Sequence, residues 1–337
     1  FLYLIASVYA FLMASHAAEE EPKTIRVITR KSPLALAQTR IVVDRIKKTF
    51  PALEFTIETI ETSGDANLQQ ALPLIGGKGV FTQELEHALL EGLVDIAVHS
   101  LKDLPLDLPP GLTIGACLPR EDPSDVVVFP DASDVSTLEM LPPGAVVGTS
   151  SLRRKYTIKY LYPHLEVLDI RGNLQTRLDK LNGKYNSEKK YDAIVLAHAG
   201  IKRSGCTSNY KVLSDEEFMH APGQGFLAIE CRKDGRILEI LRCLQDPISE
   251  KTWQAERSIL AALEGGCHTP LAVFTRLEGN SLLMKAAVYD AEGCRESSGE
   301  ESATMDAAET LGFKLAQRMS VKRSETIEHL NNVDESM

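Results

Sequence analysis

Residues 24–60 read TIRVITRKSPLALAQTRIVVDRIKKTFPALEFTIETI, and the order of their local signals indicates the fold class. The apolar run at 25–28 is typical of a short strand. Ser32 followed by Pro33 predicts a helix start, because serine is a good N-cap and proline is tolerated in the first helical turn. Apolar residues then recur at helical spacing, and residues 55–57 alternate as a strand does. The stretch therefore predicts a strand, a helix and a second strand.

Strand and helix signals keep alternating beyond this unit. Further strands are expected at 95–99, 112–117, 126–129, 146–147, 166–170, 193–196 and 227–230, and two or three more up to residue 288. Helices are expected at 81–91, 151–161, 174–181, 250–263, 305–319 and 323–331. Such alternation predicts an α/β protein with mostly parallel sheets.

The length of 337 residues suggests two or three domains. We expect a leader or disordered tail at 1–23, and a first domain at 24–118 that regains a return segment at about 224–242. A second domain is expected at 119–223, and a third, smaller one at 247–337.

The composition, 44% apolar and 25% charged, is that of an ordinary globular protein. The net charge of −10 argues against a general nucleic-acid binder. Basic residues nevertheless gather in two segments, 23–48 and 149–180. Basic islands on an acidic chain suit a small anionic substrate, although a solvated charged face gives the same composition. We expect no nucleic-acid or membrane partner, and a monomer.

Six cysteines are scattered along the chain without a C-x-x-C pair, so we expect free thiols in a reducing compartment and no metal. Residues 1–13 form an apolar run, and Ser15-His16-Ala17 resembles a signal-peptidase site. We nevertheless expect Met13 to be the true start, followed by a polar, acidic tail. We expect a cytoplasmic protein, with a plastid or secretory route as the alternative if residues 1–17 are a leader.

Three strand-to-helix junctions carry hydroxyls and arginines. They are RKSP at 30–33, TSSLRR at 149–154, and RGN at 171–173 followed by Arg177. Backbone N–H groups and the helix dipole favour an anion at such a junction, and guanidinium groups bind carboxylates with two donors. One such junction is equally well explained by an N-cap with surface bases. Three in series favour a site for several carboxylates.

Two further motifs carry reactive side chains. HSLKD at 99–103 follows a strand at the end where ligands bind in open α/β sheets, and it offers a cation beside a carboxylate. GGCH at 265–268 places Cys267 on a glycine-flanked turn that a ligand can approach closely. Taken alone, the first motif is also a loop ion pair, and the second is also a buried structural cysteine.

The segments TRKSPLALAQT, GGKG, VHSLKDLP, GTSSLRR, RGN, PGQG and LEGGC occur in this order. Over roughly residues 24–275 the chain thereby resembles the porphobilinogen deaminase family. The resemblance implies two domains like type II periplasmic binding proteins plus a smaller α/β C-terminal domain. It also implies the condensation of four porphobilinogen molecules into hydroxymethylbilane with release of ammonia, and a dipyrromethane cofactor.

The resemblance further implies roles for individual residues. Asp103 would be the catalytic carboxylate, and Cys267 would carry the cofactor through a thioether. Other cofactor ligands would be Lys102, Ser100, Arg153, Arg154, Thr149, Ser150 and Gln224. Porphobilinogen ligands would be Arg30, Ser32, Arg171, Arg177, Lys78 and Phe81.

A solute-binding protein for a small anion is the main alternative, because a fold with two lobes and anion-binding junctions suits it equally well. A phosphate-binding transferase has less support, since the chain has neither a Walker A loop nor a dinucleotide-binding fingerprint.

Overall fold

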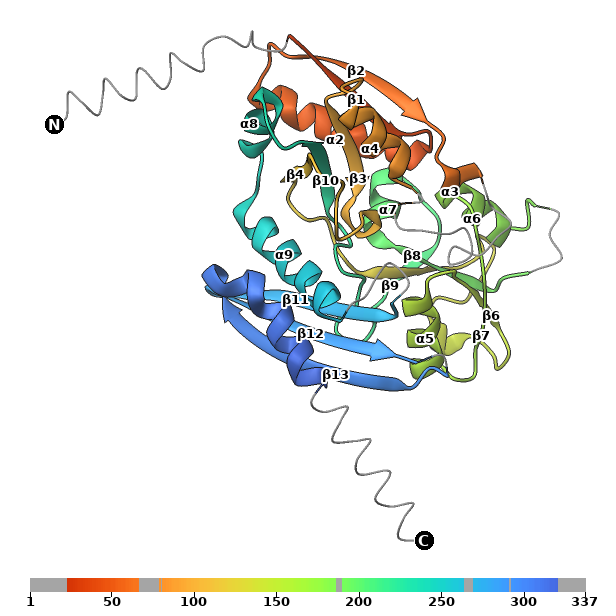
Figure 1. The fold of residues 1–337 in the computed structure, drawn as a ribbon. Helices are drawn as coiled ribbons and strands as arrows, with labels where there is room; N and C mark the ends of the chain where they lie inside the picture. Colours follow the sequence, from red (N-terminus) through yellow and green to blue (C-terminus); the bar gives the residue numbers. More distant parts are fainter. Residues whose placement is uncertain are drawn as a thin grey trace, which may run out of the picture.

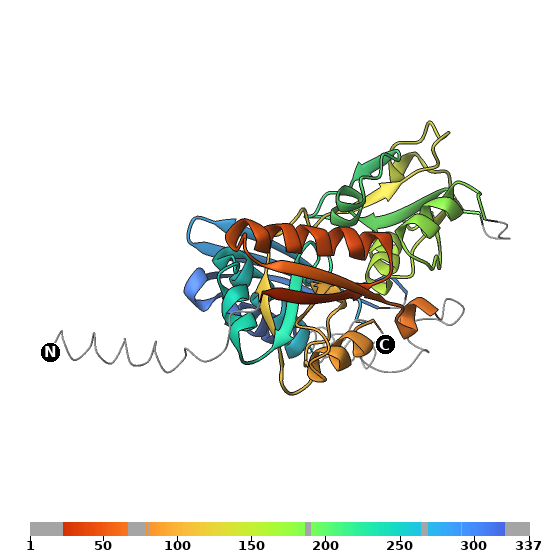
Figure 2. The same cartoon turned by 90° about the horizontal axis from the view of Figure 1, so that it is seen from above.

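A computed structural model describes residues 23–66, 79, 81–185, 190–263, 269–290 and 292–320. Three sheets organise this part of the chain (Figure 1). The first two form separate lobes, which Figure 2 shows side by side. The expected leader or tail and the helix expected at 323–331 lie outside the described residues.

The first sheet has the strand order β2-β1-β3-β10-β4. Its strands are β1 (Thr24–Arg30), β2 (Glu54–Ile60), β3 (Ile96–Ser100), β4 (Leu112–Cys117) and β10 (Leu227–Arg232). β1 is parallel to β2 and β3, whereas β10 is antiparallel to both of its neighbours. The late segment of the chain thus inserts between two early strands.

Helices cover both faces of this sheet. They are α2 (Pro33–Thr49), α3 (Ser63–Ala66), α4 (Gln83–Leu90) and α8 (Arg236–Arg242). α2 and α8 share one apolar cluster with the sheet, and α4 packs in another with Ile28 and Ala97. Ser32 is the N-cap of α2, as expected: its hydroxyl accepts a 3.2 Å hydrogen bond from the Ala35 amide.

The second sheet repeats the design with the order β7-β6-β8-β5-β9. Its strands are β5 (Asp125–Val128), β6 (Val146–Gly148), β7 (Glu166–Leu168), β8 (Ala193–Ala197) and β9 (Tyr210–Val212). Its helices are η3 (Leu138–Met140), α5 (Leu152–Leu161), α6 (Leu174–Leu181) and α7 (His198–Ser204). In both sheets, parallel strands end at one edge and are followed by a turn and a helix.

The third sheet contains β11 (Leu271–Glu278), β12 (Ser281–Tyr289) and β13 (Arg295–Thr304). The long helix α9 (Pro247–Ala262) and the helical segment that begins as η4 (Met305–Thr310) pack on it. In Figure 1, α9 lies between this sheet and the first lobe.

The expectation of mostly parallel sheets is wrong in part. The third sheet is entirely antiparallel, and β5 and β10 run against their neighbours in the other two. Short strand signals do not carry direction, which depends on where the chain returns. The segment expected to be helical from residue 305 begins as a 3₁₀ turn. Within the described residues, no helix is long and apolar enough to cross a membrane.

Candidate active site

The predicted site residues follow strands at corresponding edges of the two lobes. β1 and β3 are parallel neighbours, so Arg30 and Ser100 end at the same edge of the first sheet. β6 and β7 are parallel neighbours in the second sheet, and Thr149 and Arg171 follow their ends. Gln224 lies three residues before β10 and contacts side chains from both lobes. The structure therefore brings the three basic junctions and the HSLKD motif toward one region.

A single 3₁₀ turn, η2 (Leu101–Asp103), carries Lys102 and Asp103. The turn is anchored by Leu101, which is fully buried and whose amide donates to the Phe226 carbonyl. Gly223 has a φ of +77°, and a Cβ there would lie 3.1 Å from the Lys102 amide nitrogen. A glycine is therefore needed for the backbone of the PGQG segment to lie against the turn.

The Lys102 ammonium donates a 3.1 Å hydrogen bond to the side-chain oxygen of Gln224. Burial and the positive charge of Arg154 lower the pKa of Lys102 to about 8, although Asp103 and Asp125 act in the opposite direction. Lys102 is therefore a cation held among other cations, and a bound anion would stabilise its charged form.

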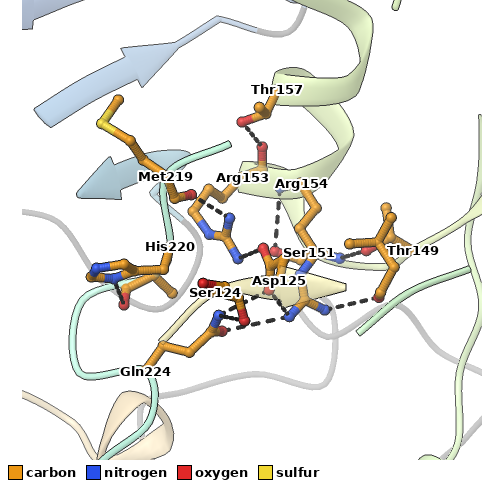
Figure 3. A network of polar contacts seen from close by, with 12 residues as sticks. Ser124, Asp125, Thr149, Ser151, Arg153, Arg154, Thr157, Met219, His220 and Gln224 are labelled. Carbon is orange, nitrogen blue, oxygen red and sulfur yellow. Dashed lines mark hydrogen bonds and ion pairs between the residues drawn. The ribbon is translucent and has the colours of Figure 1, made fainter. Parts of the chain in front are cut away.

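Arg153 and Arg154 lie in the first turn of α5 (Figure 3). Both side chains are nearly inaccessible to solvent. Their guanidinium groups donate to opposite oxygens of the buried Asp125 carboxylate, at 2.8 and 2.7 Å. The same carboxylate accepts from the Gln224 amide at 2.9 Å. Both arginine charges and these hydrogen bonds hold the pKa of Asp125 far below its usual range despite its burial.

Asp125 does not satisfy all the donors of this pair. Arg153 also donates to the Met219 carbonyl, and Arg154 to the Val195 carbonyl. The Nε atoms of both arginines are buried, and no hydrogen-bond partner is found for either among the described residues. Unsatisfied buried donors on a cation are costly, so each Nε atom needs an acceptor that the described residues do not supply.

Arg177 extends the cationic cluster. Burial, together with the charges of Arg154, Arg171 and Arg30, lowers the pKa of Arg177 to about 10, and Asp103 partly opposes this. Its Nε atom donates to the Gly172 carbonyl at 2.8 Å. Burial also lowers the pKa of Arg171. These arginines come from both lobes and repel one another, as expected of a site built for a ligand with several negative charges.

The hydroxyl groups of the site have local partners. Ser32 caps α2, Ser150 donates to the Ile170 carbonyl, and Thr149 accepts from the Ser151 amide. Ser100 accepts a 3.1 Å hydrogen bond from the side-chain amide of Gln38 on α2. These contacts order the junctions, so the hydroxyl groups help to shape the site.

Phe81 lies beside Arg30, with the guanidinium carbon 4.3 Å from the ring centroid. This is a cation–π contact that orients the arginine. The predicted ligands Lys78 and Cys267 lie outside the described residues.

Sequence reasoning missed Asp125 and Gln38. A signal was present for each: Asp125 is a lone charged residue opening the apolar strand DVVV, and Gln38 interrupts the apolar stripe of α2. Neither signal identifies its partner, since Arg154 lies 29 positions and Ser100 62 positions away.

We predict that Asp125→Asn lowers the free energy of unfolding by about 3 kcal/mol, because it leaves two buried guanidinium groups without an anion. Urea-induced unfolding measures the change. Asp134→Asn, an exposed position in the same lobe, is the control and should be near neutral. Equal stability of the two variants would contradict this role of Asp125.

Together, these features define a class: a two-lobed α/β protein with a buried cluster of cations that suits a polycarboxylate. The carboxylate of Asp103 lies beside this cluster. Residues 25–239 match the family model described as "Porphobilinogen deaminase, dipyromethane cofactor binding domain", and residues 251–320 match its C-terminal domain. The chain belongs to the porphobilinogen deaminase family. It is a transferase of tetrapyrrole biosynthesis that condenses four porphobilinogen molecules into hydroxymethylbilane with release of ammonia, using a dipyrromethane cofactor.

Two relatives illustrate the match. The porphobilinogen deaminase of Prochlorococcus marinus subsp. pastoris is 42% identical over 305 residues, covering 90% of this chain and 95% of the relative. That of Gloeobacter violaceus is 45% identical over 309 residues, covering 90% and 93%.

Solved structures are more distant. The periplasmic VFT2 domain of Bordetella pertussis BvgS gives a TM-score of 0.38 at 15% identity, covering 75% of this chain and 97% of that one. The methionine-binding protein MetQ gives a TM-score of 0.38 at 12% identity, covering 72% and 95%. These scores carry no argument for a solute-binding function.

The described residues fit the dipyrromethane. Each pyrrole of the group carries an acetate and a propionate, so several carboxylates must be bound at once. The unpartnered Nε atoms of Arg153 and Arg154 and the crowded charges of Lys102 and Arg177 are the matching cationic groups.

Proposed function

We propose that the cationic cluster binds the acetate and propionate groups of the cofactor and of incoming porphobilinogen, and that Asp103 is the catalytic carboxylate. The observation that supports this most directly is the mutual repulsion of the cations. Burial and the positive charge of Arg154 lower the pKa of both Lys102 and Arg177, and the Asp103 carboxylate opposes both shifts. Bound carboxylates would relieve this repulsion.

We assign the cofactor side of the site to Lys102, Arg153 and Arg154, with Ser100, Thr149, Ser150 and Gln224 ordering it. The substrate side is assigned to Arg30, Ser32, Arg171, Arg177, Lys78 and Phe81. Cys267 is the proposed point of covalent attachment. When bound, the dipyrromethane supplies the free pyrrole α-carbon from which the chain is extended.

The role proposed for Asp103 follows from the chemistry of the substrate. Loss of ammonia from porphobilinogen leaves an electrophilic methylene group and a positive charge on the pyrrole nitrogen. A carboxylate beside that nitrogen stabilises the charge and can accept the proton that is released when the ring regains aromaticity. Asp103 interacts electrostatically with both Lys102 and Arg177, so it lies beside the proposed cationic cluster.

The Lys102 pKa of about 8 gives a pH-dependent prediction. Its protonated fraction in the unloaded protein falls about eightfold between pH 7.5 and 9, so capture of carboxylates should weaken over that range. Unloaded protein, made in cells that cannot synthesise porphobilinogen, is incubated with porphobilinogen at each pH. The rate of mass gain is followed by intact-mass spectrometry and should fall several-fold.

The matched control is Lys102→Arg, because an arginine keeps its charge throughout this range. In this variant the rate of mass gain should no longer fall near pH 8, even if the rate is lower at every pH. An equal fall in rate in the parent and in Lys102→Arg would assign the pH dependence to another group.

We also infer three structural units: residues 24–118 with a return segment at about 224–242, residues 119–223, and residues 247–337. The three sheets support this division.

We infer a cytoplasmic location, because every cysteine in the described part of the chain is free. A C-terminal fluorescent tag on the complete open reading frame, expressed in native cells, should give a diffuse cytosolic signal. Plastid or secretory signal would overturn the inference.

A further inference from the structure

Helix α9 connects the third sheet to the turn that carries Asp103. Ala255 and Ile259 of this helix belong to the apolar core of the third sheet. Trp253 instead packs against the cluster that contains Leu101 and Leu104, on either side of Lys102 and Asp103. α9 ends at Ala262, five residues before Cys267. The helix thus contacts the turn that carries Asp103 and ends five positions before Cys267 in the sequence.

Glu256 fixes α9 against the two chain segments that pass between the lobes. Its carboxylate accepts from Arg120 at 2.7 and 3.1 Å, and from the Gly223 amide at 2.8 Å. Thr275 of β11 donates to the same carboxylate at 2.7 Å. Glu256 is fully buried, and its partners Arg120 and Thr275 are partly buried, so α9 is a rigid reference for the neighbouring backbone.

The next residue, Arg257, contacts the backbone directly after Asp103. Its guanidinium group donates to three successive carbonyls: to Leu104 at 3.3 Å, to Pro105 at 2.5 Å and to Leu106 at 2.9 Å. This backbone belongs to no helix or strand, and Pro105 has no N–H with which to form a turn bond. One rigid, planar side chain therefore determines where this irregular segment runs.

We propose that Arg257 is a positioning residue for the condensation reaction. By holding residues 104–106 against α9, it fixes the Asp103 carboxylate relative to the helix end that leads to Cys267. The proposal rests on the assignment of Asp103 as the catalytic carboxylate. A small displacement of a reacting group lowers the rate strongly. Binding of the acetate and propionate arms should be little affected, because we assign it to other residues.

The first test compares Arg257→Gln with the parent, both as holoenzyme of verified mass. We expect kcat to fall roughly tenfold with KM nearly unchanged, because a shift of about 1 Å is enough for such a loss. Arg257→Lys keeps the charge but cannot span three carbonyls, so its kcat should lie between the two. Lys251→Gln is the control on the same helix: its salt bridge to Glu309 lies away from the turn, and it should keep parental kcat.

The second test separates positioning from a general structural role. Asp103→Glu moves the carboxylate by one methylene and lowers kcat on its own. If Arg257 acts through Asp103, adding Arg257→Gln to this variant should lower kcat by much less than tenfold, since neighbouring effects are not additive. Full multiplication of the two losses would overturn the proposal, as would a lower melting temperature of Arg257→Gln with parental kcat.

The single variants distinguish the two assignments. Parental kcat in Arg257→Gln overturns only the positioning role and leaves Asp103 as the catalytic carboxylate. Parental kcat in Asp103→Glu overturns the assignment of Asp103, and the positioning role with it.

Discussion

A Cys267→Ser variant is expected to purify without the mass of two added pyrroles and to show no measurable condensation activity. Attachment of the cofactor needs a nucleophile that attacks an electrophilic methylene carbon near neutral pH. A thiolate is present to a few per cent even at an ordinary pKa and is intrinsically nucleophilic, whereas a serine hydroxyl without a base is not. The expected effect is therefore loss of the covalent product, read directly from the intact mass.

The other cysteines make a matched comparison. Burial raises the pKa of Cys231 to about 12 and that of Cys117 further still, so neither is a ready nucleophile. Cys243 is exposed at the end of α8, and Cys243→Ser should keep both the added mass and the activity. A Cys267→Ser protein that still carries the pyrrole mass would show that the attachment site is elsewhere.

The local steps of the fold were predictable because they depend on neighbours in sequence. Ser32 with Pro33 defines the start of α2, and helix α6 was expected at its observed bounds. Strand direction was not predictable in this way. β10 inserts between β3 and β4 because residues more than 100 positions away offer it unpaired edges. β13 was missed because RESSGEESAT is polar and lacks an alternating apolar face.

The site shows the same division. The cations were visible in sequence, because Arg153, Arg154, Arg171 and Arg177 stand at strand-to-helix junctions with an evident affinity for anions. Asp125, the partner of Arg153 and Arg154, was not identified, and neither was Arg257. The roles of Asp125 and Arg257 depend on contacts with residues that lie 28 to 153 positions away in the sequence. These contacts form only when the lobes and α9 pack together. Local sequence thus indicates which groups are candidates for anion binding, and tertiary structure determines how they are oriented.

The Asp103→Asn variant is expected to lose about 3–4 kcal/mol of transition-state stabilisation, which corresponds to roughly 10²–10³ in kcat. The geometry of the turn should survive, because it is fixed by backbone contacts: the Leu104 amide donates to the Leu101 carbonyl, and Arg257 binds the carbonyls that follow. Asparagine has nearly the same shape but no charge to offset the positive pyrrole nitrogen. The loss should therefore appear in kcat with little change in KM, since we assign binding of the substrate's arms to the arginines.

Steady-state kinetics on holoenzyme of verified mass measures this effect, since slow cofactor assembly would otherwise mimic a catalytic defect. Asp107→Asn, an exposed position four residues further along, is the control and should keep parental kcat. The pyrrole charge develops only after ammonia begins to leave, so a single-turnover experiment should locate the loss in the chemical step and not in product release. Near-normal single-turnover rates in Asp103→Asn would refute the catalytic assignment, because no other carboxylate is seen on the described part of this turn.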